Sequence, residues 1–430
     1  MSIKPIALMA LSLVCANRVY ADDANEKTDS DLKTQIEVLK NRVEALEKKA
    51  DDSDEATQNL AIEVSQQSNK TAANTFNPGI GVVLTGKYLY QDPGDHEFSM
   101  PGFILGDESG PGDSGFSAGE SEVNLAANID DKFYGSLTIS FENGADVEEA
   151  FLQTMALPAG LKVKFGKFLS DIGYLNSHHA HTDDFASRPL VYQAFLGNAF
   201  SDSGVQLSWL APTTLYWESG AELFRGDTFP GAGAGHNGQG ISTVYSHVGG
   251  DINFSQSWRA GISLMNASVT DRSDPQGELF SGDSKLLIAD FVWKWAPNGN
   301  TKITNAKIQA EYFKRSEDGT FTNASAVALP LTSHQDGWYL QGVYQFRPQW
   351  RIGLRYEQAA AEDLSSDFNS TGLDNLGQRS KQTSAMIDWS NSEFSRVRLQ
   401  YSHDAASPDT ANLWTLQYIA ALGAHGAHAF

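Results

Sequence analysis

The chain is poor in cysteine, poor in basic residues and without any long apolar run. Only one of its 430 residues is a cysteine, and 31 Lys and Arg stand against 53 Asp and Glu, a formal net charge of −22. A protein that binds nucleic acid needs basic surface to neutralise phosphates, so this function is excluded. A transmembrane helix needs about 18 or more consecutive apolar residues, and no stretch approaches that length.

Residues 1–21 have the features of a secretory signal peptide. Lys4 gives a short basic start, Ile6–Ala16 is apolar, and Val19–Ala21 fits a small-residue cleavage site. Cleavage would remove Cys15, so the mature chain would contain no thiol, as suits an oxidising compartment. Lipid attachment at Cys15 is a second interpretation, although Val14 is a poor residue for a lipobox.

Residues 22–75 are expected to form a periplasmic arm that ends in a polar linker. Apolar residues recur there at steps of four and three, which predicts a coiled coil from about Asp29 to Gln67. A helix with an apolar stripe must bury it, so self-association is expected, and packing on the chain's own barrel is the alternative. The predicted oligomerisation residues are Leu32, Ile36, Leu39, Val43 and Leu46.

Residues 76–430 are expected to form a barrel domain. From Gly79 to Phe430, sixteen stretches of roughly ten residues alternate between apolar and polar side chains. Short and long connections alternate between them, which is typical of an outer-membrane β-barrel with short periplasmic turns and long external loops. The predicted fold is all-β, a sixteen-stranded antiparallel transmembrane barrel after an α-helical coiled coil. The short turns are centred on 130–132, 158–160, 211–213, 255–257, 297–299, 347–349 and 391–393, and the long loops include 91–116, 169–202, 226–240, 272–284, 316–335 and 358–379.

The two faces of each predicted strand differ in polarity. The apolar face should contact lipid, because a Lys or Arg at mid-bilayer costs about 2–4 kcal/mol. The polar face should line an aqueous lumen, which a sixteen-stranded barrel is wide enough to contain. The candidate pore-lining residues are Glu120, Glu122, Lys162, Lys164, Glu218, Glu222, Glu311, Arg351, Arg355, Glu357, Arg396 and Arg398. Their mixed charges favour polar or zwitterionic solutes, or a weak preference for cations.

The last predicted strand, Leu413–Phe430, ends in a C-terminal Phe430. An amphipathic final strand with this ending resembles the signal that the outer-membrane assembly machinery reads. Gly426 and His428 stand at positions where that signal usually has larger apolar residues.

The third external loop holds a cluster of histidines and carboxylates. His178, His179, His181, Asp183 and Asp184 lie within seven residues. Neutral imidazoles and carboxylates can supply three or four ligands to Zn²⁺ or Cu²⁺, and a helical segment would pair His178 with His181 or His179 with Asp183. The alternative is that the histidines are hydrogen-bonding residues that hold the loop on the barrel wall. No resident cofactor is expected, and zinc enters only as a candidate transport ligand.

The segment Gly160–Phe168, which leads into this loop, is similar to the corresponding strand of trimeric substrate-selective porins, such as the phosphate-selective and dicarboxylate-type families. This resemblance implies a homotrimer in the outer membrane of a Gram-negative bacterium, in contact with lipopolysaccharide, with a third loop that narrows the channel.

A second resemblance is to outer-membrane proteins labelled zinc-regulated receptors of the TonB-dependent class. It is carried by the segments 178–185, 188–190, 194–197, 204–212, 222–227 and 423–430. It implies a link to zinc supply. Receptors of the TonB-dependent type, however, have twenty-two strands around a plug. The sixteen candidate strands of this chain therefore favour passive or facilitated diffusion.

Three functions compete at this point. A trimeric diffusion channel is the main hypothesis, and a TonB-dependent-type zinc receptor is an alternative. A structural tether, with the coiled coil reaching towards the cell wall, is another, since forty helical residues would extend about 60 Å. A barrel enzyme is not expected, because the sequence has no Gly-x-Ser-x-Gly motif.

Overall fold

The computed structural model describes Glu37 and residues 78–423, apart from residues 95–97, 142–143, 232–237 and 275. The described residues exclude the predicted signal peptide and Phe430. They also exclude the predicted coiled coil except for Glu37, which is helical. Within the described part of the chain, no helix is long and apolar enough to cross a membrane.

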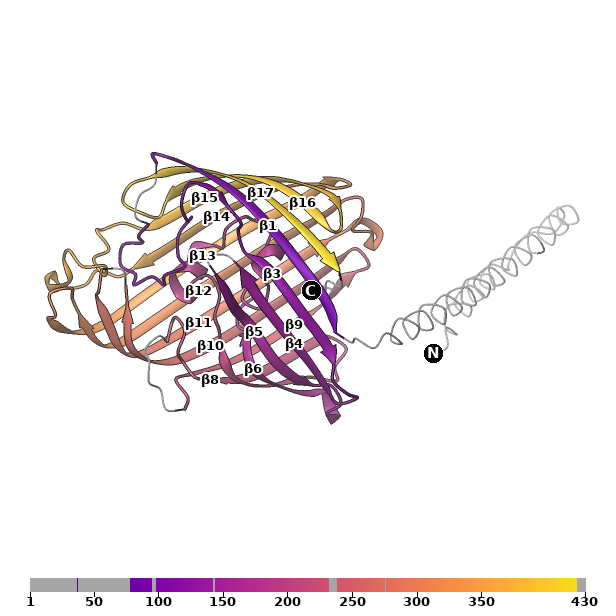
Figure 1. Cartoon of the computed structure of the whole chain (residues 1–430), viewed down its shortest axis with the longest axis horizontal. Coiled ribbons are helices and arrows are strands. Elements are labelled where there is room, and N and C mark those ends of the chain that lie inside the picture. Colours follow the sequence, from indigo (N-terminus) through magenta and orange to yellow (C-terminus); the bar gives the residue numbers. More distant parts are fainter. Residues whose placement is uncertain are drawn as a thin grey trace, which may run out of the picture. The chain divides into compact units, whose positions relative to one another are not determined.

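The described strands make one antiparallel sheet that closes on itself (Figure 1). β1 pairs with β17 from Gly81↔Gly423 to Asp92↔Asn412, so the barrel has no open edge. β2 and β3 pair with successive parts of the same strand β1 and together act as one strand of the wall. The seventeen strands therefore form the sixteen-stranded barrel that the sequence predicts. The strands are β1 (Gly79–Asp92), β2 (Gly115–Ser117), β3 (Ser121–Asn128), β4 (Phe133–Phe141), β5 (Ala145–Thr154), β6 (Leu161–Leu169), β7 (Ser201–Leu210), β8 (Tyr216–Phe224), β9 (Ile241–Asn253), β10 (Gln256–Ser273), β11 (Leu279–Trp295), β12 (Asn305–Thr322), β13 (Ala328–Arg347), β14 (Trp350–Ala361), β15 (Ser380–Ser392), β16 (Ser395–Ala405) and β17 (Ala411–Gly423).

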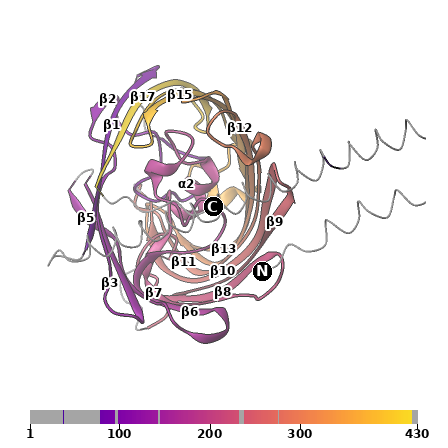
Figure 2. The same ribbon diagram turned by 90° about the vertical axis from the view of Figure 1, so that its right-hand side faces the viewer.

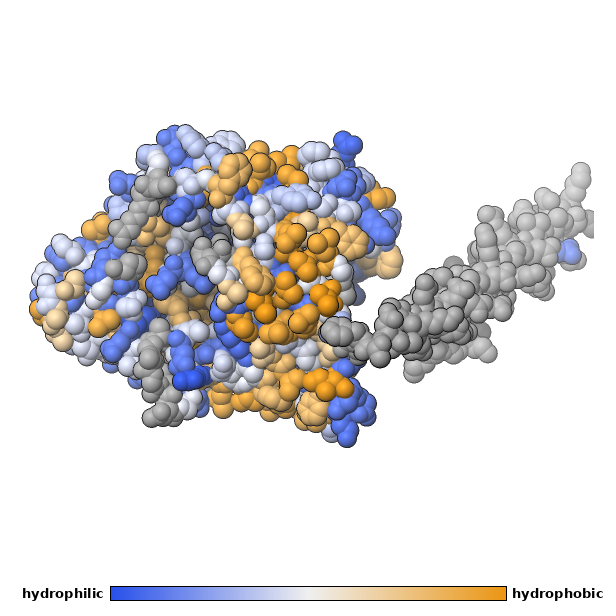
Figure 3. All heavy atoms as spheres, in the orientation of Figure 1, coloured by the Kyte–Doolittle hydropathy of each residue, from blue (hydrophilic) through white to orange (hydrophobic). Residues whose placement is uncertain are grey.

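The lipid-facing parity is the predicted one. On β14, Ile352 and Leu354 are exposed on the outer wall, whereas Arg355 and Glu357 are buried inside. The same alternation places Leu399 outside and Arg398 inside on β16. Figure 3 shows hydrophobic residues gathered on the outer wall of the half of the barrel from which β1 begins.

The short turns are confirmed, and two of the predicted long loops are corrected. The 3₁₀ turns η1 (Pro158–Gly160) and η3 (Pro297–Gly299) fall where the sequence placed turns. The predicted loops 272–284 and 316–335 are mostly strand, because the β10–β11 and β12–β13 hairpins continue outward as paired ladders. Polar and apolar residues alternate in these segments too, so periodicity alone does not mark where the membrane ends.

The interior of the barrel holds a hydrophobic core. It is built by the first external loop (residues 93–114), the third loop (residues 170–200) and the inner faces of β10–β13. Seen along the barrel, the helix α2 (Leu190–Leu196) lies inside the ring of strands (Figure 2). The core residues include Phe103, Ile104, Phe168, Val191, Phe195, Phe200, Phe280, Ile288, Phe313 and Phe321. The expectation of a polar lumen face therefore fails on this side, because loop side chains replace water there.

Candidate channel constriction

The third loop folds into the lumen and carries α2 with it. All seven residues of α2 are buried, as expected for a helix in which every residue except Gln193 is apolar or aromatic. The helix ends at Gly197, which has left-handed backbone angles (φ 59°, ψ 48°) that favour glycine. Its aromatic residues pack on the wall: the rings of Phe195 and Phe313 of β12 stack with centroids 5.7 Å apart. The loop is therefore part of the barrel interior.

The two ends of the loop are joined by one buried side chain. The Asn176 amide donates to the carbonyl oxygens of Ser170 (2.8 Å) and Phe200 (2.9 Å), and Asn176 Oδ1 accepts from the Phe200 N–H at 2.7 Å. The first turn of the loop is held by β8, because Glu222 accepts from the Asp171 N–H at 3.0 Å and from the Ser170 hydroxyl. These bonds fix the angle at which the loop enters the lumen.

The strand carboxylates predicted to line the pore hold the loop backbone instead. Glu311 accepts from the Tyr174 N–H (2.9 Å) and the Tyr192 hydroxyl, and Glu357 accepts from the Leu190 N–H at 2.6 Å. Glu311 and Glu357 are 2 % and 0 % exposed. Their polarity therefore satisfies loop donors that could not otherwise be buried.

The predicted basic residues also bind the loop. Arg351 donates to Asp184 Oδ1 at 2.9 Å, and Lys307 of β12 contacts the other oxygen of the same carboxylate. Arg355 donates to the Ser187 carbonyl at 2.8 Å. Two further arginines donate to loop carbonyl oxygens: Arg396 to His181 at 2.6 Å and Arg398 to Asp183 at 2.5 Å. Burial raises the pKa of Asp184, but the Lys307 and Arg351 charges outweigh it and hold that pKa well below its usual value.

At its other side the loop meets an acidic wall. His181 Nδ1 lies 2.7 Å from Glu122 Oε1 on β3. His179 lies between two carboxylates of β5, with Nδ1 3.2 Å from Glu148 and Nε2 3.2 Å from Glu149. Burial disfavours a charged ring, but the hydrogen bonds to Glu148 and Glu149 raise the pKa of His179 well above its usual value.

These contacts make the segment 179–184 a bridge across the lumen. β5, which His179 contacts, and the strands β12 and β14, which Asp184 contacts, lie on far sides of the ring in the strand order. The bridge includes the 3₁₀ turn η2 (Ala180–Thr182) and is held by acidic side chains at one end and basic side chains at the other.

The predicted five-residue metal set does not converge. His178 Nδ1 contacts the Tyr174 carbonyl at 2.7 Å, and burial together with the Arg188 charge lowers the pKa of His178 to about 3. Asp183 pairs with Arg188 at 2.6 Å, and Asp184 lies with the basic residues. His179 and His181 share the carboxylate partner Glu122. The segment is extended on both sides of η2, so the pairs expected of a longer helix do not form.

The remaining predicted pore residues lie on β2–β8. Lys162 is 3.8 Å from Glu218, and the Lys164 ammonium lies over the rings of Phe151 and Phe168. Glu120, between β2 and β3, is partly exposed on the inner side, near Glu122 and Glu148.

Sequence reasoning missed Glu148 and Glu149, and a bulge explains why. Thr138 of β4 pairs with Glu149 and Ile139 pairs with Val147, so Glu148 is an extra residue in β5. A bulge of this kind re-aims a side chain, and both neighbouring carboxylates reach His179. Strict alternation, the signal used for the other strands, would place one of these two glutamate side chains on the outer face of the barrel.

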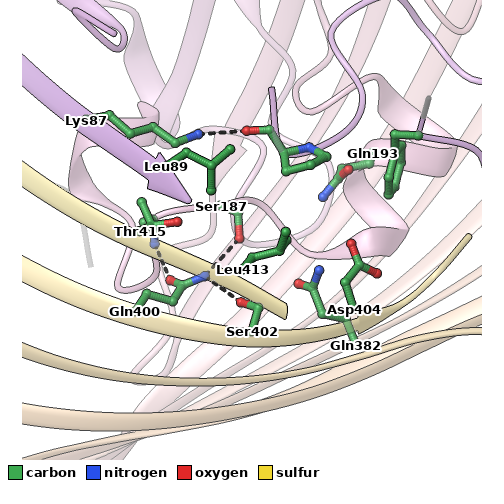
Figure 4. A pocket seen from close by; sticks show the side chains of 13 residues that line it. Lys87, Leu89, Ser187, Gln193, Gln382, Gln400, Ser402, Asp404, Leu413 and Thr415 are labelled. Atoms are coloured by element: carbon green, nitrogen blue, oxygen red, sulfur yellow. Dashed lines mark hydrogen bonds between the residues drawn. The ribbon is translucent and has the colours of Figure 1, made fainter. Parts of the chain in front are cut away.

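A gap remains between residues 186–193 of the third loop and the inner face of β1 and β15–β17 (Figure 4). Its empty space, open solvent included, is about 360 Å³. Gln382 and Asp404 come into it from the strands, and Gln193 from α2. On its loop side, Gln400 donates to Ser187 Oγ at 3.2 Å. The full lining is Lys87, Leu89, Phe98, Pro111, Ala186, Ser187, Gln193, Gln382, Gln400, Ser402, Asp404, Leu413 and Thr415.

Comparisons with known proteins place this architecture. No family model matches the chain. An uncharacterized protein of Aquifex aeolicus is 30 % identical over 406 residues, which cover 86 % of this chain and 82 % of that protein. The chain belongs to the family of this Aquifex protein. The resemblance to zinc-regulated receptors finds no support in these comparisons.

Among solved structures, this chain shares the barrel fold of several outer-membrane porins. Each of three such structures matches 80 % of this chain. The first is an anion-selective porin from Comamonas acidovorans, with a TM-score of 0.52, 10 % identity and 99 % of that chain covered. The second is OmpT of Vibrio cholerae in its trimer form, with a TM-score of 0.51, 14 % identity and 99 % of that chain covered. The third is the outer membrane channel DcaP of Acinetobacter baumannii, with a TM-score of 0.51, 12 % identity and 97 % of that chain covered. These identities support a common fold.

Proposed function

We propose that this protein is an outer-membrane porin through which small polar solutes diffuse, with the third loop as its constriction. The observation that carries the proposal is the bridge 179–184, which crosses the lumen of a closed sixteen-stranded barrel. A loop held at both ends narrows a pore without closing it when polar space remains beside it, and the gap lined by Gln382, Gln400 and Asp404 is such a space.

The solute class follows from the lining of this gap. The arginines on the inner wall are already engaged with loop carbonyls and carboxylates, so they do not form the open basic ladder that phosphate selectivity requires. Of the thirteen residues that line the gap, six carry an amide or hydroxyl group and five are apolar, and Lys87 and Asp404 are its charged side chains. This composition favours neutral or zwitterionic solutes.

The trimeric state, the periplasmic coiled-coil arm at residues 22–75 and the signal peptide at residues 1–21 are part of the proposal. The trimeric state draws support from the trimer form of OmpT, which shares the fold. The TonB-dependent alternative is disfavoured, because plugged transporters of that class have about twenty-two strands and this wall has sixteen. The alternative that the protein is a structural tether differs from the channel in predicting no conductance.

Cysteine modification in a planar bilayer tests the proposed path. The mature chain is expected to contain no thiol, so Gln382→Cys would be the sole target of a methanethiosulfonate reagent. We expect modification to reduce the conductance in discrete steps, three for a trimer. Asn266→Cys, at an exposed position of β10, is the matched control and should leave the conductance unchanged.

Conductance that is the same before and after modification of Gln382→Cys would place the path elsewhere. A protein with no conductance at all would reject the channel and favour the tether.

A further inference from the structure

The acidic wall and the bridge form a cluster of two imidazoles and three carboxylates. Glu122 comes from β3, Glu148 and Glu149 from β5, and His179 and His181 from the third loop. All five side chains are partly or fully buried: the exposed fractions are 4 % for Glu122, 16 % for Glu148, 12 % for Glu149, 23 % for His179 and 7 % for His181. Segments far apart in the sequence thus bring a mixed nitrogen and oxygen donor set together.

The cluster has more negative charge than its own histidines can balance. Three carboxylates carry about three charges, and two imidazoles supply at most two even when both are protonated. Excess negative charge is costly in a partly buried place, so the cluster favours a further cation.

Two atom separations around His179 Nδ1 are close to those between ligands of a tetrahedral ion. This nitrogen lies 3.4 Å from Glu122 Oε2 and 3.2 Å from Glu148 Oε2. Ligands at about 2.0–2.2 Å from a tetrahedral ion are separated by about 3.3–3.6 Å. Among the described residues, Glu122, Glu148 and His179 form the group whose ligand atoms all lie within 4.8 Å of one another.

The surrounding contacts are those that orient metal ligands. Glu149 binds the other ring nitrogen of His179, Nε2, at 3.2 Å. His181 binds the second oxygen of Glu122, Oε1, at 2.7 Å. Carboxylates that hold the far nitrogen of a ligating histidine fix its orientation and strengthen it as a ligand. The β5 bulge makes this possible, because it lets Glu148 and Glu149 approach opposite sides of one ring.

We propose that Glu122, Glu148 and His179 bind one divalent transition-metal ion of the Zn²⁺ class, with Glu149 and His181 as orienting residues. The ion ties the third loop to β3 and β5, at the end of the bridge opposite to the Asp184 ion pairs. Three protein ligands leave a fourth position for water or for a solute ligand in the lumen. The site is independent of which solute the channel passes.

Metal binding to the full purified protein tests this site. Equilibrium dialysis with Zn²⁺ should give one more bound ion per chain for the wild type than for His179→Gln. Co²⁺ in place of Zn²⁺ should give a visible absorption band that the same substitution abolishes. Glu149→Gln, which changes an orienting residue, should weaken binding by about 10- to 100-fold without removing it.

A second histidine–glutamate pair provides the matched control. His334 Nδ1 lies 3.0 Å from Glu362, with both side chains exposed, so His334→Gln should bind Zn²⁺ as the wild type does. Glu148→Gln keeps the shape of the site and removes one ligand charge, and it should lose the ion while the barrel still folds, as the mobility of the unheated protein in gel electrophoresis would show.

Equal binding by wild type, His179→Gln and Glu148→Gln would overturn the site and leave a protonated His179 as the countercharge. Absence of conductance in the wild type as well as in the variants would refute the channel alone, since Zn²⁺ binding is measured separately.

Discussion

Arg351 of β14 donates to Asp184 Oδ1 at 2.9 Å, so a residue of the loop that starts after β6 is held by the far wall of the barrel. Arg351 also donates to Asp388 of β15 at 3.0 Å, so its guanidinium faces two carboxylates. The constriction of the proposed channel therefore depends on charge pairs that form inside the lumen.

Asp184→Asn should release this end of the bridge. The substitution removes the countercharge of Lys307 and Arg351 in a place where Asp184 is only 5 % exposed, and breaking a buried pair in this way costs about 3–5 kcal/mol. We expect a larger or noisier single-channel current and easier unfolding in urea. Asp227→Asn, which breaks the exposed Arg225–Asp227 pair, should cost less than about 1 kcal/mol. Identical currents for wild type and Asp184→Asn would contradict this role.

The Asp184 pairs should survive mild acid. Because the pKa of Asp184 lies below its ordinary value of 3.8, its contribution to stability is present above that value and is lost only as the pH falls through the lower folded-state pKa. The difference in unfolding free energy between wild type and Asp184→Asn should therefore be the same at pH 7 and pH 5. If this difference in unfolding free energy shrinks markedly at pH 5, the pKa of Asp184 is not lowered by Lys307 and Arg351 as expected.

Gly173 lets the loop backbone lie against Glu311. Its φ is +64°, and an added Cβ would lie 2.6 Å from Glu311 Oε2 and 2.9 Å from the Tyr192 hydroxyl. Gly173→Ala should cost about 2–4 kcal/mol, from the left-handed backbone and from overpacking together. Gly277→Ala isolates the backbone effect, since its φ is +81° and nothing lies within 4 Å of the added atom. Equal losses in urea unfolding for the two variants would mean that the Glu311 contact is unimportant.

Phe195→Ala should loosen the loop from the inner wall. Phe195 is fully buried and stacks on Phe313, and truncation of such a phenylalanine costs about 3–5 kcal/mol. We expect proteolysis within residues 170–200 to become faster, which timed digestion of the folded barrel would measure. Phe291→Ala, on the lipid face of β11 with a 43 % exposed side chain, should leave the digestion rate unchanged. Protection of the loop in Phe195→Ala would show that its polar contacts alone hold it.

The sequence by itself determined the barrel: sixteen strands, their lipid-facing sides and the place of each short turn. These features are local, because a strand that faces lipid on one side must alternate at every second residue. It could not show that Glu311 and Glu357 hold the loop rather than line the pore, because that depends on where residues 170–200 fold.

Only the tertiary structure decided which histidines meet which carboxylates. The five clustered residues His178–Asp184 separate: two meet carboxylates of β3 and β5, and Asp184 meets cations of β12 and β14. Asp183 and the carbonyl of His178 contact Arg188 of the loop itself. Glu148 reaches His179 because of the bulge in β5. The alternation pattern used to predict the strands does not reveal this bulge. Of the proposed site, proximity along the chain predicted only His179 and His181, and the closure of the barrel brought Glu122, Glu148 and Glu149 to them.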